Sequence, residues 1–204
     1  MRKAIIIMLI VVMAIFANAI ANDKMLKNEN PTGGDLLAAD VCDYNTNLLW
    51  DQPPTDCDGN WALVTSDSDY GYVAYDDYSV NSPIGGITVW WSDLHYSGDW
   101  QECHEDPMPV NIYFCPDAGG VPDTANPACS YFYYFVPVFL CQLSGSYDVY
   151  RTDIDLSSPC NQVDGWVGFE GLGNGDSCGF MWYTSVDGNG TNSYQTNVGI
   201  TDYE

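Results

Sequence analysis

Aspartate-rich turns are the feature of this sequence that points most directly to chemistry. Asp67 and Asp69 flank a serine ahead of a Tyr-Gly pair, and Asp187-Gly-Asn189-Gly forms a second turn near the C-terminus. Alternating carboxylate and amide oxygens can wrap Ca²⁺, which takes six to eight oxygen ligands. Asp and Asn also favour turns because they bond their own backbone, so turn formation alone is the alternative. We therefore expect Asp67, Asp69, Asp187 and Asn189 to be candidate ligands of Ca²⁺, and we expect no other cofactor.

Aromatic residues offer a second kind of site. The chain has 7 tryptophans and 15 tyrosines, and exposed rings can stack on sugars while nearby Asp and Asn bond the hydroxyls. Burial in a core is the alternative for any single ring. Trp90 and Trp91 are adjacent in an expected strand, so they must point to opposite faces. We predict a ligand-binding patch of Trp90, Tyr96 and Trp100 around the loop that holds His95.

A catalytic set is hard to assemble from these residues. The two histidines, His95 and His104, are nine positions apart, which suits neither a helical nor a tight strand site for zinc or copper. No G-x-S-x-G motif is present, and a Ser-His-Asp set would have to recruit the histidine loop. Carboxylates are too abundant to identify the facing pair of a glycosidase. We predict no catalytic residues and retain a secreted glycan-active hydrolase as an alternative.

The cysteines indicate an oxidising compartment. An even number in an exported chain predicts disulfides, and eight cysteines allow 105 pairings. The closest neighbours have eleven residues between them, which argues against a zinc site built on C-x-x-C pairs. We expect the local pairs Cys42–Cys57 and Cys160–Cys178, because each closes a loop of modest length. The predicted disulfide-forming residues are Cys42, Cys57, Cys103, Cys115, Cys129, Cys141, Cys160 and Cys178.

The charge of the chain excludes some classes of partner. There are 28 Asp and Glu against 5 Lys and Arg, for a net charge of −23. A nucleic-acid binder needs the opposite sign to neutralise phosphates, so we expect no nucleic-acid partner. An anionic membrane surface would repel the chain as well. Bound cations or a salt-rich habitat would both offset the repulsion among these acids, and the sequence does not separate the two.

The N-terminus has the pattern of a secretory signal peptide. A short basic start is followed by the apolar run 4–16 and by small residues at alternate positions up to Ala21. We expect residues 1–21 to be a signal peptide, with an uncleaved anchor as the alternative. Residues 22–40 read as a flexible leader to a folded part at 41–204. This predicts a secreted, extracellular or cell-surface protein with no membrane span after cleavage.

The residue pattern of the remaining chain is typical of an all-β domain. Short runs rich in Val, Ile, Tyr, Phe and Trp are separated by Gly, Pro, Asn and Asp. Val110, Ile112 and Phe114 alternate with polar residues, which predicts one buried strand face. The fold class we predict is a single disulfide-stapled β-sandwich of jelly-roll or immunoglobulin-like type. Its nine expected strands lie near 61–65, 71–80, 86–91, 109–115, 130–138, 146–155, 164–170, 178–184 and 193–200.

Three segments carry a resemblance to a known class of module. They are 73–91, with its Tyr-Asp-Asp-Tyr strand; 110–122, which ends in Asp117-Ala-Gly-Gly-Val-Pro122; and 165–190, with Gly-Trp-Val-Gly-Phe followed by Cys-Gly-Phe-Met-Trp. Together they resemble the secreted β-sandwich modules of large bacterial surface proteins. The resemblance implies a non-catalytic role and supplies no ligand. Such modules continue through a last strand where this chain ends at Glu204, so we expect that strand or a C-terminal anchoring region to be missing.

Taken together, these patterns predict a non-catalytic extracellular or cell-surface module for adhesion, matrix or glycan contact, with Ca²⁺ as a candidate stabiliser. The expected partners are a glycan or a surface protein. Self-association is a further expectation, because an incomplete last strand favours strand donation between copies and a self-assembling surface filament.

Overall fold

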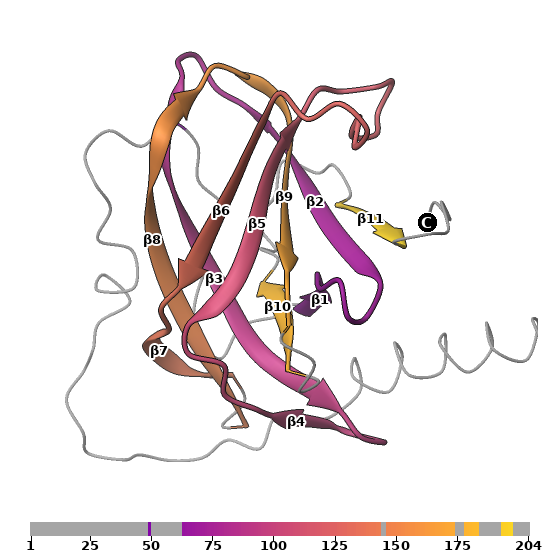
Figure 1. Cartoon of the computed structure of the whole chain (residues 1–204), viewed down its shortest axis with the longest axis vertical. Helices are drawn as coiled ribbons and strands as arrows, with labels where there is room; N and C mark the ends of the chain where they lie inside the picture. The colour runs from indigo at the N-terminus through magenta and orange to yellow at the C-terminus, as the bar shows by residue number, and fades with distance from the viewer. Residues whose placement is uncertain (1–48, 50–62, 144–145, 174–177, 184–192, 198–204) are drawn as a thin grey trace, which may run out of the picture. The chain divides into compact units, whose positions relative to one another are not determined.

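The structure is a computed structural model that describes residues 49, 63–143, 146–173, 178–183 and 193–197 (Figure 1). These residues form eleven strands and no helix. The strands make two sheets of antiparallel pairs that pack face to face, which confirms the predicted all-β sandwich. All described strands belong to one compact unit. A helix long and apolar enough to cross a membrane is not found in the described part of the chain.

Each sheet joins segments that are distant in sequence. Sheet A has the order β1-β10-β3-β8-β7, with β4 paired to β3 outside this path. Its strands are β1 (Leu63–Thr65), β3 (Ile84–Tyr96), β4 (Trp100–Glu102), β7 (Val138–Leu143), β8 (Tyr147–Cys160) and β10 (Gly179–Tyr183). Sheet B has the order β11-β2-β9-β5-β6. Its strands are β2 (Tyr72–Ser79), β5 (Met108–Cys115), β6 (Cys129–Phe135), β9 (Asp164–Gly171) and β11 (Tyr194–Asn197).

The main core lies between the two sheets and follows the alternation in the sequence. In β5, Val110, Ile112 and Phe114 are almost fully buried, while the residues between them face away from the core. Trp91 of β3 is 0% exposed and stacks on Phe180 of β10 with ring centroids 5.6 Å apart. Because successive side chains of a strand point to opposite faces, alternation in the sequence selects the residues of this core.

Two strands were not expected from the sequence. β4 exists because Gly98, with φ of 94°, turns the chain back after β3 in a three-residue loop. The expected strand at 130–138 ends at Phe135, and β7 starts at Val138 in the other sheet. Pro137 lies between them, and proline has no N–H to donate to a ladder. The two corrections together account for eleven strands in place of nine.

The disulfides differ from the predicted local pairs. Cys103 is bonded to Cys178, and Cys129 is bonded to Cys160. The predicted pair Cys160–Cys178 is therefore wrong. Cys160 lies opposite Ile84 at the start of β3, whereas the residue after Cys178 lies opposite Leu94, ten residues further along the same strand. At about 3.3 Å per residue, the two cysteines are roughly 30 Å apart.

Two further cysteines complete the described set. Cys115 is a free, buried thiol, so the prediction that it forms a disulfide is wrong. Its side chain lies in an apolar cluster with Val73, Tyr75 and Trp166 on the face of sheet B that points away from sheet A. Cys141 is disulfide-bonded. The predicted pair Cys42–Cys57 lies outside the described residues.

The outward face of sheet B depends on a glycine. Gly168 of β9 lies opposite Tyr75 of β2, and a Cβ added at Gly168 would overlap the tyrosine ring. Tyr75 is 4% exposed and lies 6.3 Å from Tyr194 of β11, measured between ring centroids. The missing side chain therefore leaves the space in which the Tyr75 ring packs.

Candidate functional site

The predicted aromatic patch exists in part, at the end of the β3–β4 hairpin. Tyr96 and Trp100 are a directly opposed cross-strand pair on either side of the turn. Their ring centroids lie 5.3 Å apart, as expected for directly opposed side chains on one face of a hairpin. Asp99 fixes the turn, because its carboxylate accepts the N–H of Trp100 at 2.9 Å and its carbonyl accepts the N–H of Ser97 at 3.1 Å.

Tyr70 is a third member of the group and was missed by the sequence analysis. Its hydroxyl accepts the N–H of Tyr96 at 3.1 Å, and its ring centroid lies 6.1 Å from that of Trp100. The ring packs over Gly179 of β10, where an added Cβ would overlap it. Tyr70 belongs to the turn before β2 and has no sequence signal that connects it to a hairpin 26 residues away. We call Tyr70, Tyr96 and Trp100 the aromatic corner.

The aromatic corner is exposed but not flat. Tyr96 is 57% exposed and Trp100 is 37% exposed. The Tyr96 and Trp100 rings are inclined by 62°, and the Tyr70 and Trp100 rings by 56°. A sugar would therefore stack on one ring and touch a second ring at its edge, because the rings do not form a coplanar platform.

Trp90, the remaining predicted member of the patch, is not part of the aromatic corner. It is 8% exposed and packs with Val149 and Tyr183 on the face of sheet A that points away from the core. The prediction that Trp90 and Trp91 face opposite ways is confirmed, since Trp91 is in the main core. The assignment of Trp90 to an exposed patch is wrong, because other side chains cover its face of the sheet.

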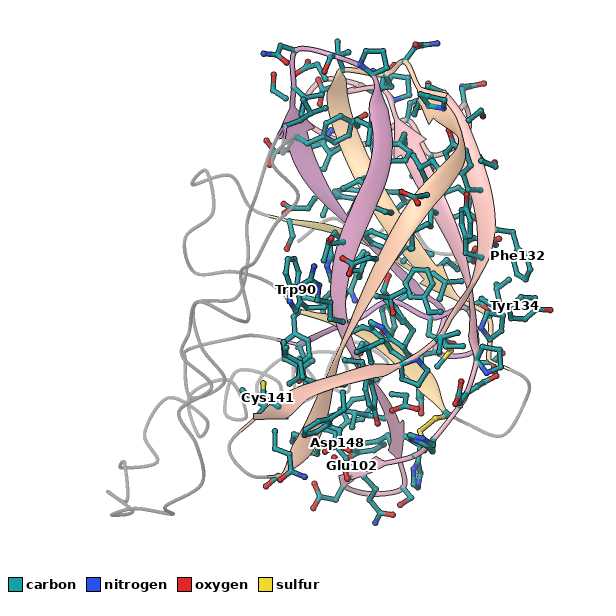
Figure 2. All side chains as sticks on the ribbon, turned by 90° about the vertical axis from the view of Figure 1, so that its left-hand side faces the viewer. Trp90, Glu102, Phe132, Tyr134, Cys141 and Asp148 are labelled. Carbon is teal, nitrogen blue, oxygen red and sulfur yellow. A yellow bond between two sulfur atoms is a disulfide. The ribbon has the colours of Figure 1, made fainter. Side chains whose placement is uncertain are left out.

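A network of polar side chains holds β4 beside β8. It includes Glu102, which is two residues after Trp100 of the aromatic corner. The carboxylate of Glu102 accepts the N–H of Asp148 at 2.5 Å, and Gln142 donates to the Asp148 carboxylate at 2.9 Å. Figure 2 shows Glu102 and Asp148 close together at one end of the sandwich. Ser92 donates to the carbonyl of Asp148 and shares a 2.9 Å hydrogen bond with the hydroxyl of Tyr183. One carboxylate oxygen of Glu102 and one of Asp148 thus link β4, β7 and β8.

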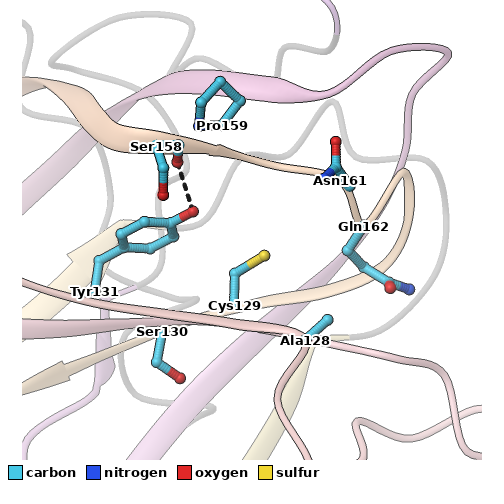
Figure 3. Close-up of a pocket in the computed structure, with 8 residues that line it drawn as sticks. All are labelled: Ala128, Cys129, Ser130, Tyr131, Ser158, Pro159, Asn161 and Gln162. Carbon is cyan, nitrogen blue, oxygen red and sulfur yellow. Dashed lines mark hydrogen bonds between the residues drawn. The ribbon is translucent and has the colours of Figure 1, made fainter.

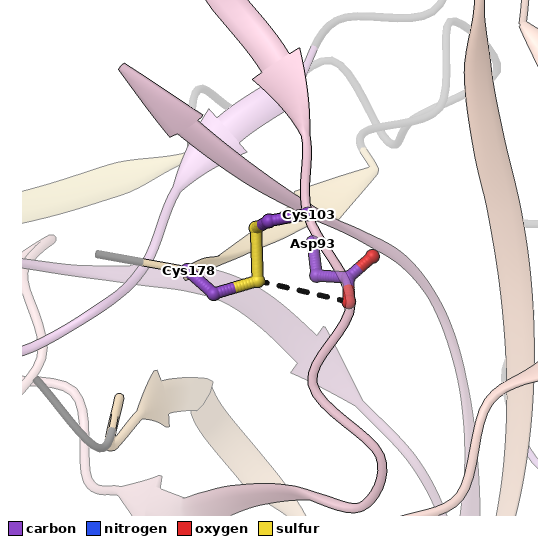
Figure 4. Close-up of side chains that lie close together, drawn as sticks. All are labelled: Asp93, Cys103 and Cys178. Atoms are coloured by element: carbon purple, nitrogen blue, oxygen red, sulfur yellow. Dashed lines mark hydrogen bonds between the residues drawn. A yellow bond between two sulfur atoms is a disulfide. The ribbon is translucent and has the colours of Figure 1, made fainter. Parts of the chain in front are cut away.

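Asp93 is a buried carboxylate beside a disulfide. It is 2% exposed, and it accepts the N–H of Glu105 at 2.7 Å. Burial raises its pKa above the usual range, and the hydrogen bond from Glu105 and the nearby His104 oppose that rise. Its carboxylate lies 3.8 Å from Sγ of Cys178, a contact drawn as a dashed line in Figure 4. Asp93, Cys103 and Cys178 have ligand atoms close enough to hold a metal, but both sulfurs are in the disulfide and offer no thiolate.

Among the described residues, the histidines do not form a metal-binding group with other side chains. His104 is exposed, and its Nδ1 lies 3.3 Å from the hydroxyl of Tyr150. His95 is partly buried in β3, opposite Gln101. In the described part of the chain, neither histidine belongs to a group of three potential ligands.

In the first of the predicted Ca²⁺ turns, the Asp67 carboxylate is buried and bonds the backbone. Asp67 is 0% exposed, and its two carboxylate oxygens accept the N–H groups of Asp69 at 2.9 Å and Phe180 at 3.0 Å. Burial is the main cause that raises the pKa of Asp67 to about 6, against the lowering effect of these two hydrogen bonds. Asp69 is exposed in the same turn. Asp187 and Asn189 lie outside the described residues.

The Asp117-Ala-Gly-Gly-Val-Pro122 loop, one of the segments that resemble bacterial surface modules, is a turn held by hydrogen bonds to Asp117. The Asp117 carboxylate accepts the N–H groups of Gly119 and Gly120 and the Nε1–H of Trp166, at 2.9 to 3.1 Å. The hydrogen bond from Trp166 is the main cause of a lowered pKa at Asp117. Gly119 and Gly120 have φ of 85° and 94°, which other residues rarely adopt.

A shallow open pocket of about 390 Å³ lies between β6 and the end of β8 (Figure 3). The Tyr131 hydroxyl crosses it to donate to the carbonyl of Ser158 at 2.7 Å. Its lining offers hydroxyls and amides but no carboxylate, so it does not present the two facing acids of a glycosidase. The lining residues are Ala128, Cys129, Ser130, Tyr131, Ser158, Pro159, Asn161 and Gln162.

We compared the chain with known protein families, curated proteins and solved structures. A scan against family models, a search of curated proteins and a search of solved structures each gave no match to this chain. The resemblance to bacterial surface modules therefore stays a prediction that rests on the segments quoted above.

Proposed function

We propose that this chain is a non-catalytic, secreted β-sandwich module that contacts a glycan through the aromatic corner. The observation that carries the proposal is the exposure of Tyr96 and Trp100, which pack on each other while remaining open to solvent. Two large rings held together at a hairpin end form a small, preorganised apolar surface. A role in adhesion or matrix contact follows from such a surface on an exported, disulfide-bonded domain.

The surroundings of the aromatic corner favour an uncharged ligand. Asp99 lies in the turn between the two rings, and Glu102 follows in β4. These carboxylates can accept hydrogen bonds from sugar hydroxyls, and they repel sulfated or sialylated groups. With a net charge of −23 on the whole chain, long-range repulsion acts in the same direction. The ligand class that we propose is a neutral glycan.

A binding assay with a matched control tests this proposal. Neutral glycans are screened against the oxidised protein, and binders are titrated by calorimetry and by tryptophan fluorescence. We expect Trp100→Ala to weaken binding by about tenfold or more, since loss of about 1.4 kcal/mol of ring contact corresponds to a factor of ten. Phe132→Ala removes a ring that is 50% exposed on sheet B, and we expect it to bind normally.

Two results would contradict the proposal. One is that Trp100→Ala and Phe132→Ala lose binding equally, which would show that the site is elsewhere or that the loss is general. The other is tight binding of acidic glycans only, which the carboxylates around the aromatic corner cannot accommodate.

Stabilisation by Ca²⁺ is the second part of the proposal. Asp67 and Asp69 lie in one turn, and each carboxylate oxygen of Asp67 has a lone pair beyond the one that its backbone hydrogen bond uses. Repulsion among 28 acidic residues would be reduced by a bound cation. We propose that Ca²⁺ stabilises the folded chain, and the thermal test is given in the Discussion.

A further inference from the structure

Five of the nine exposed large apolar side chains in the described part of the chain lie where β6 passes into β7. These five residues are each 50 to 62% exposed. Figure 2 shows Phe132 and Tyr134 projecting away from the sandwich at its edge, and their ring centroids are 5.1 Å apart. We call this surface the β6–β7 apolar stripe; its members are Phe132, Tyr134, Val136, Val138 and Phe139.

The β6 part of the stripe, Phe132 and Tyr134, is exposed because the residues on either side of these rings are held inward. The Tyr133 hydroxyl donates to the carbonyl of Asp155 at 3.0 Å and accepts the N–H of Ser157 at 2.7 Å. The Tyr131 hydroxyl bonds the same strand, and the Cys129–Cys160 disulfide closes its end. With alternate residues fixed against β8, the residues between them must face solvent.

The link between the two strands is fixed as well. The carbonyl of Val136 accepts the hydroxyl of Thr152 at 3.2 Å, and the same hydroxyl accepts the indole N–H of Trp91 at 2.9 Å. The backbone of the stripe is thereby joined to the main core. A surface held in this way loses little conformational entropy when a partner covers it.

The stripe is also the neutral part of a strongly acidic chain. No charged residue occurs from Thr124 to Tyr147, although the net charge is −23. The cross-strand neighbours of Tyr134 and Phe132 in β5 are Pro109 and Asn111, which are uncharged. Opposite Val138 lies Arg151, whose guanidinium is paired with Asp153 at 3.0 Å.

We propose that the β6–β7 apolar stripe is a homotypic interface, covered by the same stripe of a second copy across a two-fold axis. Two acidic chains repel each other over most of their surfaces, so they can approach closely only where both are neutral. A basic partner protein would bind to the acidic parts of the surface instead, so it would not cover the neutral stripe. This interface is separate from the aromatic corner and does not depend on the proposed function.

The area of the stripe limits the strength of the contact that it can make. Five half-exposed residues offer on the order of 500 Å² of apolar surface, which is near the upper limit for a monomer. This is less than the roughly 800 Å² per partner of a standard interface, so the stripe suits a weak contact. The contact is therefore a reversible dimer with an apolar centre.

Sedimentation velocity of the mature, oxidised protein over a wide concentration range tests the proposal. We expect a monomer–dimer equilibrium that moves toward dimer in molar NaCl, because salt screens the repulsion between the two acidic chains. Tyr134→Glu and Val138→Glu place charges in the stripe from different sheets. We expect each to raise the dimer dissociation constant at least tenfold, since a two-fold axis brings both new charges together.

Val163→Glu is the matched control, because Val163 is exposed apolar surface outside the stripe; its dimerisation should match that of the unaltered chain. Circular dichroism and the melting temperature establish that each variant is folded. A protein that stays monomeric at millimolar concentration in molar NaCl would overturn the proposal. So would equal weakening by all three substitutions, or binding of the monomer to phosphatidylcholine vesicles through the stripe with no dimer formed.

Discussion

The buried carboxylate of Asp67 predicts an unusual dependence of stability on pH. Its pKa is raised from 3.8 to about 6 because the folded chain removes it from water. Below pH 3.8 the group is protonated in both the folded and the unfolded chain, so its ionisation has no effect on stability. Between pH 3.8 and 6 the unfolded chain loses the proton first, and the free energy of unfolding falls as pH rises. Above pH 6 the carboxylate is ionised in both states, so the free energy of unfolding no longer changes through this group.

The size of the effect follows from the size of the pKa shift. One pKa unit corresponds to 1.36 kcal/mol, so a shift of about two units destabilises the fold by about 3 kcal/mol at neutral pH. At pH 5 the folded chain has already bound most of the proton, and roughly half of that penalty remains. We therefore expect Asp67 alone to add roughly 1 kcal/mol of stability when the pH falls from 7 to 5.

Asp67→Asn isolates this contribution from the other acids. Asparagine cannot ionise, but its amide places an NH₂ where one carboxylate oxygen accepted a backbone N–H. That leaves either Asp69 or Phe180 without its hydrogen bond, at a cost of about 1–3 kcal/mol at any pH. At pH 7 the stability lost with the hydrogen bond nearly cancels the stability gained because no charged carboxylate is buried. At pH 5 the variant should be less stable than the unaltered chain by roughly 1 kcal/mol more than at pH 7.

Urea unfolding at pH 5, 6 and 7 in EDTA measures this difference. Asp76→Asn is a useful second variant, because burial also raises the pKa of Asp76 to about 6, and it should show a slope of the same sign. A stability difference between Asp67→Asn and the unaltered chain that stays constant from pH 7 to 5 would refute the reasoning. If Asp67→Asn is instead more destabilised, relative to the unaltered chain, at pH 7 than at pH 5, the folded state stabilises the carboxylate and the sign of the argument is wrong.

Two other predictions concern packing and metal binding. Gly168→Ala should destabilise the fold by about 1–3 kcal/mol, because the added methyl overlaps the Tyr75 ring. Gly85→Ala, where nothing lies within 4 Å of the added methyl, is its control, and equal melting temperatures for the two variants would contradict the packing argument. Millimolar Ca²⁺ should raise the melting temperature above that in EDTA, by mass action on the folded state. NaCl at the same ionic strength should not reproduce that rise, and if it does, the acids are only being screened and the Ca²⁺ proposal is wrong.

Alternation in the sequence was enough to predict the sandwich and the core of β5. Val110, Ile112 and Phe114 face inward because a strand sends successive side chains to opposite faces, and that rule needs no knowledge of the partner strands. The same rule predicted that Trp90 and Trp91 would separate. It could not predict that Trp90 would be covered, since the residues that pack on it, Val149 and Tyr183, come from other strands.

The disulfides show the limit of local reasoning. Spacing along the chain favoured Cys160–Cys178, yet strand order places these two cysteines near opposite ends of β3. Which cysteines pair depends on which strand ends lie next to each other. Strand order in the sheets cannot be deduced from the spacing of cysteines along the chain. Cys115 is free for a related reason, because its side of β5 faces an apolar cluster.

The sequence by itself determined the fold class, the acidity and the candidate residues at the β3–β4 hairpin. Tyr96 and Trp100 are close together because a short turn places them opposite each other, which is a local property. Only the tertiary structure added Tyr70 to the aromatic corner, buried Trp90 and Asp67, and left the β6–β7 apolar stripe exposed. These features depend on contacts between distant segments, and periodicity reports only which face of a strand is apolar, never which partner covers it.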